Sequence, residues 1–160
     1  MDSSEKIKEI TTSIRHINQR FRLLKLLRIA KDEYDRNNYE GCVDTCLKIL
    51  ETNPENPVAL RGLGCAMQSL CKPDEAIRCY EEALKYSEKK EIEYTLIGTV
   101  YYIQDRFEEA LKYYNLAIDA NDDYEPAYEG RNQAMLENHL MLVDLQDELI
   151  EREIRGNQSL

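Results

Sequence analysis

The chain repeats itself every 34 residues, and this period constrains its fold more than any other feature. Residues 74–86 read DEAIRCYEEALKY, and residues 108–120 read EEALKYYNLAIDA. A step of 34 residues in the other direction reaches residues 40–52, EGCVDTCLKILET, which keep the acidic start and the order of small, larger and apolar residues. A fixed period of this length is typical of proteins built from stacked supersecondary units.

The segment before each copy repeats as well. LLRIAKDEY, LRGLGCAMQ and YTLIGTVYY begin at positions 26, 60 and 94, and their apolar residues have the spacing of a helix face. NPENP, EKKE and NDDYEP lie between the units, where Pro, Asn and charge clusters end one helix and start the next. The pattern predicts two short amphipathic helices per unit. Because one helix pair cannot cover its own apolar faces, neighbouring units must stack.

Small residues recur beside large ones in both helices of the unit. Gly64 and Gly98 lie in the first helices, and Tyr80 and Tyr114 lie in the second. The second helices also carry small residues at fixed positions, which are Ala76, Ala83, Ala110 and Ala117. This arrangement predicts close approach of two helix backbones at the same register in every unit.

These residues resemble the tetratricopeptide repeat family, whose units carry a large residue at position 4, Leu at 7, a small residue at 8, aromatic residues at 11 and 24, and Ala at 20 and 27. The unit 57–90 has Leu60, Leu63, Gly64, Met67, Ala76, Tyr80 and Ala83 there, and the unit 91–124 has Tyr94, Ile97, Gly98, Tyr101, Ala110, Tyr114 and Ala117. In the unit 23–56, Cys42 and Cys46 replace the Ala and the aromatic residue, so they look like packing residues. The resemblance implies an all-α fold, a right-handed α-α superhelix of three units spanning residues 23–124.

Both ends of the chain predict additional helices. Residues 1–22 are expected to form an N-terminal amphipathic helix with a narrow apolar seam, made by Ile7, Ile10, Ile14, Ile17 and Phe21. This helix either lies back on the first repeat and caps it or pairs with another chain, which gives a possible homodimer. Residues 125–160 are expected to form one long helix, or two with a break near residues 137–139, whose first turns cap the array.

The charge of the chain excludes some classes of partner. Its 21 basic and 31 acidic residues give a net charge of −10, which repels nucleic acid and anionic membrane surfaces. No apolar run approaches the roughly 18 residues needed to span a bilayer, and the N-terminus lacks the apolar core of a signal peptide. We therefore expect a cytoplasmic protein with neither nucleic-acid nor membrane partners.

The sequence also lacks the usual signs of catalysis. Five cysteines are an odd number in a chain without an export signal, so reduced thiols are expected. Cys42 and Cys46 lie one helical turn apart, but His16 and His139 are far away in sequence, and we expect no metal site. Phosphate-binding loops, metal motifs and nucleophile elbows are absent from the sequence, so we expect no cofactor and no enzymatic activity.

The resemblance implies a concave groove lined by positions 2, 5, 6, 9, 12 and 13 of the first helices, which in the unit 57–90 include Cys65, Gln68 and Ser69. The candidate contact residues at these positions are Arg28, Lys31, Tyr34, Arg61, Leu96, Thr99 and Tyr102. The groove is basic near its start and apolar and aromatic towards its end, which predicts a partner segment with a carboxylate and apolar anchors. The alternative is that its apolar residues, Leu24, Leu27, Ile92 and Ile103, are buried under the terminal helices.

These observations favour a protein-protein interaction module, an adaptor, scaffold or chaperone-like protein that binds a peptide or helix. Family members that hold chaperone tails ending Glu-Glu-Val-Asp use a clamp of Lys, Asn, Asn, Lys and Arg. The corresponding residues here are Leu27, Lys31, Gly62, Ile92 and Leu96, and none matches. Two alternatives remain: a chaperone similar to those of type III secretion systems, and a structural oligomerisation unit that uses the terminal helices.

Overall fold

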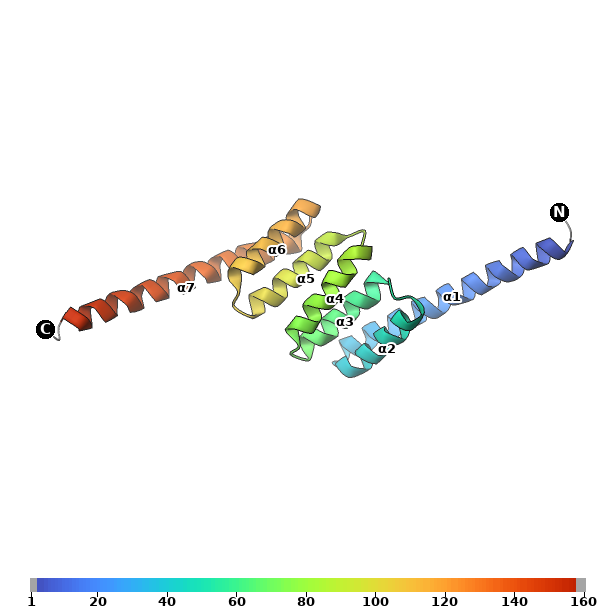
Figure 1. The fold of residues 1–160 in the computed structure, drawn as a ribbon, viewed down its shortest axis with the longest axis horizontal. Coiled ribbons are helices and arrows are strands. Elements are labelled where there is room, and N and C mark those ends of the chain that lie inside the picture. The colour runs from blue at the N-terminus through green and yellow to red at the C-terminus, as the bar shows by residue number, and fades with distance from the viewer. Residues whose placement is uncertain (1–2, 158–160) are drawn as a thin grey trace. The chain divides into compact units, whose positions relative to one another are not determined.

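A computed structural model describes residues 3–157, which fold entirely into α-helices and connecting turns (Figure 1). The helices are α1 (Ser3–Asp35), α2 (Tyr39–Thr52), α3 (Pro57–Ser69), α4 (Pro73–Tyr86), α5 (Lys90–Ile103), α6 (Phe107–Ala120) and α7 (Glu125–Asn157). Residues 3–157 contain no β-strand, so the all-α class predicted from the period is confirmed.

The chain divides into two compact units, with the boundary between Tyr86 and Ser87. In the first unit α1 packs on α2, α2 on α3, and α3 on α4. In the second unit α5 packs on α6, and α7 packs on both. The three predicted helix pairs are therefore present as α1 with α2, α3 with α4, and α5 with α6.

The turn inside each helix pair has the same backbone conformation. Asn37, Cys71 and Asp105 have φ angles of 61°, 58° and 58°, and they are spaced by the 34-residue period. The residue after each donates its backbone N–H to a carbonyl five residues earlier, which is Asn38 to Glu33, Lys72 to Met67 and Arg106 to Tyr101. This is the hydrogen bond of a Schellman motif, which ends a helix with one residue in the left-handed region.

Asparagine side chains start two of the helices. The Asn38 side chain accepts a hydrogen bond from the Gly41 N–H at 3.2 Å, and the Asn56 side chain accepts one from the Ala59 N–H at 2.9 Å. Pro57 follows Asn56 at the first helical position, where its missing N–H costs nothing. These caps satisfy amide groups that have no partner within the helix.

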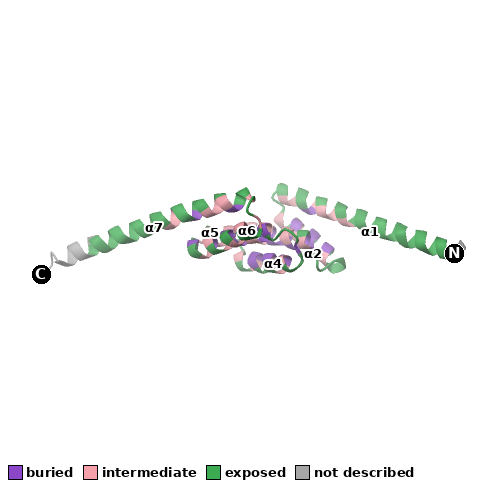
Figure 2. Ribbon diagram, turned by 90° about the horizontal axis from the view of Figure 1, so that it is seen from above, coloured by how far each residue is buried: buried purple, intermediate pink, exposed green. Residues whose placement is uncertain are grey.

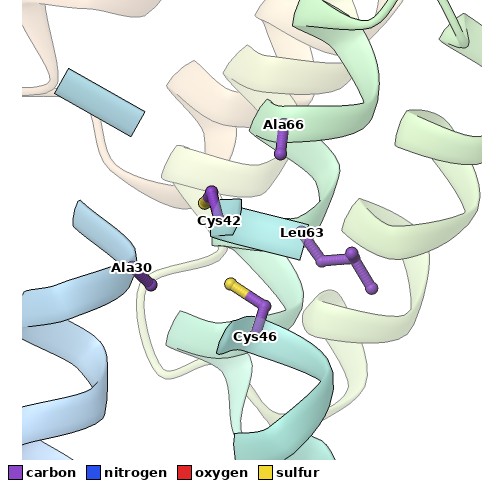
Figure 3. Packing of buried hydrophobic residues seen from close by; sticks show 5 residues of the cluster. All are labelled: Ala30, Cys42, Cys46, Leu63 and Ala66. Carbon is purple, nitrogen blue, oxygen red and sulfur yellow. The ribbon is translucent and has the colours of Figure 1, made fainter. Parts of the chain in front are cut away.

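The core of the first unit follows the predicted contact of small residues with large ones. Cys42 and Cys46 of α2 are buried and form a cluster with residues of α1 and α3 (Figure 3), which are Ala30, Leu63 and Ala66. Tyr80 of α4 is fully buried, and a Cβ atom added to Gly64 of α3 would lie 2.5 Å from its ring. The interpretation of the two cysteines as packing residues is confirmed by their burial.

In the second unit, Tyr114 of α6 is buried between two glycines. A Cβ atom added to Gly98 of α5 would lie 3.0 Å from its ring, and one added to Gly130 of α7 would lie 2.5 Å from it. Gly130 contacts Tyr114 in the same way that Gly62 of α3 contacts Cys46 of α2. A Cβ atom added to Gly62 would lie 3.1 Å from the Cys46 sulfur. The start of α7 therefore packs on α6 like the first helix of another repeat.

The two terminal helices run on beyond the repeats (Figure 2). α1 passes residue 22 without a break, and the side chains of residues 4–22 are exposed. The N-terminal stretch thus extends the first helix of the first repeat. It does not lie back on that repeat, which was one of the two expectations from the sequence. α7 is a single helix with no break near residues 137–139, and it buries Ala127 and Ala134 in its first half.

Candidate protein-interaction faces

The predicted contact residues lie on the first helix of each pair, three on α1, one on α3 and three on α5. Arg28, Lys31, Tyr34 and Arg61 belong to the first compact unit, and Leu96, Thr99 and Tyr102 belong to the second. The predicted contact residues therefore fall into two groups, one in each unit, which we call the α1–α3 face and the α5 face.

The α1–α3 face presents cationic side chains. Arg28 and Lys31 are both exposed and lie one turn apart on α1. The Lys31 ammonium is hydrogen-bonded to the Asp35 carboxylate one turn further on, and this contact raises the pKa of Lys31. The Lys31 side chain is 73% exposed, so water screens the pair strongly. Arg61 of α3 adds a third cation, which is half-buried.

Tyr34 holds α1 against its neighbours. Its hydroxyl lies 3.1 Å from the Ser69 hydroxyl of α3, and its ring meets the ring of Tyr39 edge-on at 5.3 Å between centroids. Tyr34 is half-buried, so it contributes to packing as well as to the surface predicted for partner contact.

The α3 side of this face is fixed by Tyr80. The Tyr80 hydroxyl is 3.4 Å from the Cys65 sulfur and 3.2 Å from the Gln68 side-chain oxygen, and it donates to these acceptors. Burial raises the pKa of Tyr80, so the hydroxyl keeps its proton across the physiological range. Three polar side chains of α3 that were predicted to face the groove, Cys65, Gln68 and Ser69, are thus held by tyrosines from within the unit.

The α5 face is mainly apolar. Leu96 and Tyr102 are half-buried, and Ile103 is 62% exposed. Thr99 donates to the Thr95 carbonyl at 2.9 Å and lies 3.3 Å from the Tyr114 hydroxyl, so its hydroxyl is engaged within the unit. The ring of Tyr102 packs on Phe107 at 5.7 Å, which leaves its outer edge at the surface.

A cationic hollow of about 790 Å³ lies between α1 and the end of α2. Four basic residues line it, which are Arg20, Arg22, Lys25 and Lys48, and the described lining residues include no carboxylate. Leu23, Leu26 and Ile29 of α1 supply apolar surface. Sequence reasoning missed this feature, because it depends on α1 continuing straight past the end of α2.

Rows of exposed apolar side chains cover the outer parts of α1 and α7. On α1 they are Ile7, Ile10, Ile14, Ile17, Phe21 and Leu24, with 52–69% of each side chain accessible. On α7 they are Met135, Leu136, Leu140, Met141, Leu142, Val143, Leu145, Leu149 and Ile150, with 40–60% accessible. The described outer parts of both helices are coloured as exposed in Figure 2.

Metal-binding clusters and reactive thiols are the two kinds of chemical site that the described residues allow us to assess. Within residues 3–157, no three His, Cys, Asp or Glu side chains come together in a way that could hold a metal ion. Burial raises the pKa values of Cys42, Cys46, Cys65 and Cys79, which suppresses their nucleophilic thiolate forms. In the same part of the chain, no helix has the length and apolar character that crossing a membrane requires.

Helix pairs that repeat with a 34-residue period and meet through small residues define a helical-repeat protein. Residues 57–90 and residues 94–124 match two models of the tetratricopeptide repeat, and these matches fall on α3 with α4 and on α5 with α6. Residues 57–90 and 94–124 are therefore identified as two tetratricopeptide repeats.

One curated relative shares part of this sequence. The chain is 29% identical over 103 residues to a probable UDP-N-acetylglucosamine–peptide N-acetylglucosaminyltransferase SPINDLY of Hordeum vulgare. The similarity covers 64% of this chain and 11% of the relative, so the chain spans about a tenth of that protein's length.

Solved tetratricopeptide repeat domains share the fold. The first such domain of Spaghetti (RPAP3), bound to the HSP90 peptide SRMEEVD, has a TM-score of 0.64 at 19% identity and covers 71% of this chain and 90% of its own. The Sgt2 domain from Aspergillus fumigatus has a TM-score of 0.67 at 18% identity, covering 74% and 80%. The TPR2B domain of yeast Sti1 in complex with pHsp70 has a TM-score of 0.67 at 14% identity, covering 76% and 98%. At these identities the likeness shows the fold.

Proposed function

We propose that the chain is a non-enzymatic protein-interaction module that binds a short peptide or helix of a partner protein. The observation that carries this proposal is the α1–α3 face, which combines the cations Arg28, Lys31 and Arg61 with polar groups of α3 that Tyr34 and Tyr80 already hold. A surface whose side chains are ordered before binding loses less conformational entropy when a ligand arrives. Two similar folds were solved with partners, the RPAP3 domain with an HSP90 peptide and the Sti1 domain in a complex with pHsp70, which supports this class of function.

Each face suggests the chemistry of the segment that it binds. Cations in a chain with a net charge of −10 favour a ligand segment with carboxylates, either acidic side chains or a C-terminus. The α5 face offers Leu96, Tyr102 and Ile103 to apolar anchors. Leu27, Gly62 and Ile92 stand where the Glu-Glu-Val-Asp clamp has Lys or Asn, so the peptide SRMEEVD is expected to bind weakly.

A peptide-display selection on the full chain tests this function. Selected peptides are synthesised, and their affinities are measured by fluorescence anisotropy for the wild type, for Arg61→Glu, for Tyr102→Ala and for the double variant. Reversing the Arg61 charge replaces an attraction with a repulsion, so we expect an affinity loss of about tenfold or more for acidic peptides.

Arg78→Glu is the matched control, because it makes the same charge change at an exposed position of α4, outside the proposed faces. The proposal is contradicted if Arg78→Glu weakens binding as much as Arg61→Glu does. A selection that yields no peptide with measurable affinity also contradicts it. We place the protein in the cytoplasm, where a free thiol such as that of exposed Cys71 stays reduced.

A second candidate function is self-association through the terminal helices. The specific observation in its favour is the exposure of apolar rows on α1 and α7, where Phe21 is 69% and Leu149 60% accessible. Exposed apolar surface of this extent marks interaction sites more often than free surface. Measuring the mass of the protein in solution as a function of concentration tests this function.

A further inference from the structure

The apolar row on α1 has the geometry of a coiled-coil seam. Ile7, Ile10, Ile14, Ile17, Phe21 and Leu24 follow one another at alternating steps of three and four residues. Residues at these steps lie on one side of a helix. The side of α1 that carries Ala30 and Glu33 packs against α2, where Thr45 donates to Glu33 at 2.7 Å. The seam therefore occupies a side of α1 that α2 does not use.

The outer part of α7 carries a seam of the same spacing. Leu136, Leu140, Val143, Asp147 and Ile150 are separated by steps of four and three residues, so they lie on one side of the helix. The apolar members are 40–57% accessible. Asp147 interrupts the row, and burying a carboxylate in such a seam costs least opposite a cation. A partner that supplies a positive charge at this position is therefore favoured.

The two seams have opposite charge. Residues 5–28 of α1 carry seven basic and two acidic residues, whereas residues 135–150 of α7 carry four acidic residues and neither Lys nor Arg. Arg20 and Lys25 flank the α1 seam, and Glu137 and Asp144 flank the α7 seam. Charges at these flanking positions decide which helices pair and in which direction. Two α1 helices would place cations together, and two α7 helices would place carboxylates together.

We propose that α1 of one copy of the chain pairs in parallel with α7 of a second copy. In a parallel pair equivalent seam positions meet, so a single offset fixes every layer. Arg28 follows Leu24 by four residues and continues the α1 seam, and it is the cation that can lie opposite Asp147.

The same offset pairs three apolar positions of each seam. It places Ile17, Phe21 and Leu24 opposite Leu136, Leu140 and Val143, respectively. It also brings Arg20 beside Asp144, since these are flanking positions that meet across a parallel pair. Three apolar layers, a charge pair in the seam and a charge pair at its edge thus agree on one register.

A second copy fits this surface better than a lipid bilayer does. Lys25 and Lys6 border the α1 seam closely on either side, which leaves a narrow stripe of the coiled-coil type. Helices that lie in a membrane surface present a broad apolar face instead. The pairing rests on the second candidate function, self-association, and adds to it the two helices, their direction and their register.

Charge reversal in the full chain tests the pairing. Sedimentation velocity over a range of concentrations gives the dissociation constant of the wild type, of Arg20→Glu, of Asp144→Lys and of the double variant. Each single reversal is expected to raise the dissociation constant about tenfold, and the double variant is expected to recover most of the loss. Arg15→Glu and Glu148→Lys make the same charge changes away from the seams, and they are expected to leave association unchanged. Circular dichroism checks that each variant keeps its helix content.

Three results would overturn parts of this account. A wild type that remains monomeric at every concentration removes both self-association and the pairing. A wild type that associates, but whose double variant recovers nothing or whose controls weaken association equally, removes the pairing and leaves self-association standing. A monomer that binds anionic phosphatidylserine vesicles and loses this binding equally in Arg15→Glu and Arg20→Glu assigns the α1 surface to lipid.

Discussion

Two glycines of α3 provide a test of the packing that builds each helix pair. Gly64 and Gly62 are two residues apart in the same helix, so replacing either by Ala gains about 1 kcal/mol of helix propensity. The new methyl groups meet different surroundings. At Gly64 the Cβ would lie 2.5, 2.8 and 2.9 Å from three ring atoms of Tyr80, whereas at Gly62 it would lie 3.1 Å from the Cys46 sulfur alone.

The size of the packing cost relative to the helix gain decides whether Gly64→Ala stabilises or destabilises the protein. Tyr80 is fully buried, and its hydroxyl is held by Cys65 and Gln68, so its ring cannot move aside without straining the core or losing those hydrogen bonds. Overpacking of this kind costs about 1–3 kcal/mol, and each weakened hydrogen bond about 0.5–1.5 kcal/mol. After the helix gain is subtracted, Gly64→Ala should lower the free energy of unfolding by about 1–3 kcal/mol.

Gly62→Ala is the matched control, and its free energy of unfolding should stay within about 1 kcal/mol of the wild type. Urea titration followed by circular dichroism measures both variants, provided that the dependence on urea keeps one slope. If Gly64→Ala proves as stable as Gly62→Ala, the small-against-large contact does not set the packing of the pair.

Three further predictions concern the turn, the thiols and the caps. Cys71→Gly should raise the free energy of unfolding by about 1 kcal/mol, because Cys71 has a φ of 58° that glycine adopts without strain. Cys71→Val should lower the free energy of unfolding. Urea titration measures both variants, and equal stability of the two contradicts the turn assignment. With the reagent DTNB at pH 8, exposed Cys71 should react first. Burial and raised pKa values should keep Cys42 and Cys46 unreactive until the pH rises further or the chain unfolds. Peptide mapping that finds Cys46 modified first would refute this prediction. Asn56→Ala should lower the free energy of unfolding, measured by heat or urea, by about 1 kcal/mol, because the cap of α3 is lost. Asn56→Asp should retain most of the stability. An Asn56→Ala variant as stable as the wild type contradicts the role of Asn56 as a cap.

The period of the sequence was sufficient to predict the helix pairs and much of their packing. Aligning units at 34 residues placed Cys42 and Cys46 at positions that Ala and an aromatic residue occupy elsewhere, and both are at most 2% exposed. A residue's position within the 34-residue unit predicts its burial, because stacked units make the same contacts at equivalent positions. The same reasoning placed Tyr80 and Tyr114 beside glycines, as observed.

The turn conformation could not be predicted from residue type. Asn37, Cys71 and Asp105 share the left-handed conformation, although glycine is the residue that usually marks it. Asn and Asp are tolerated there, but Cys gives no such signal. The φ angles and the backbone hydrogen bonds reveal that the 34-residue period extends to these positions.

The candidate faces were predicted less completely, because their chemistry depends on contacts between helices. Ser69 and Gln68 were expected to face a ligand, yet their polar groups are engaged by Tyr34 and Tyr80. The cationic hollow joins Arg20 and Lys48, residues from two helices whose relation is unknown until α1 is seen to extend past α2. The selection of Arg28, Lys31, Arg61, Leu96, Thr99 and Tyr102 as partner contacts remains a prediction.

The most direct test of the proposed interaction function is a titration of the isotopically labelled protein with a display-selected peptide, followed by amide chemical shifts. The account predicts that the largest shifts occur on the α1–α3 face, at and around Arg28, Lys31 and Arg61, and on the α5 face around Tyr102. Shifts confined to residues 7–24 and 135–150 would show that partners bind the terminal helices, and they would contradict the assignment of the interaction faces.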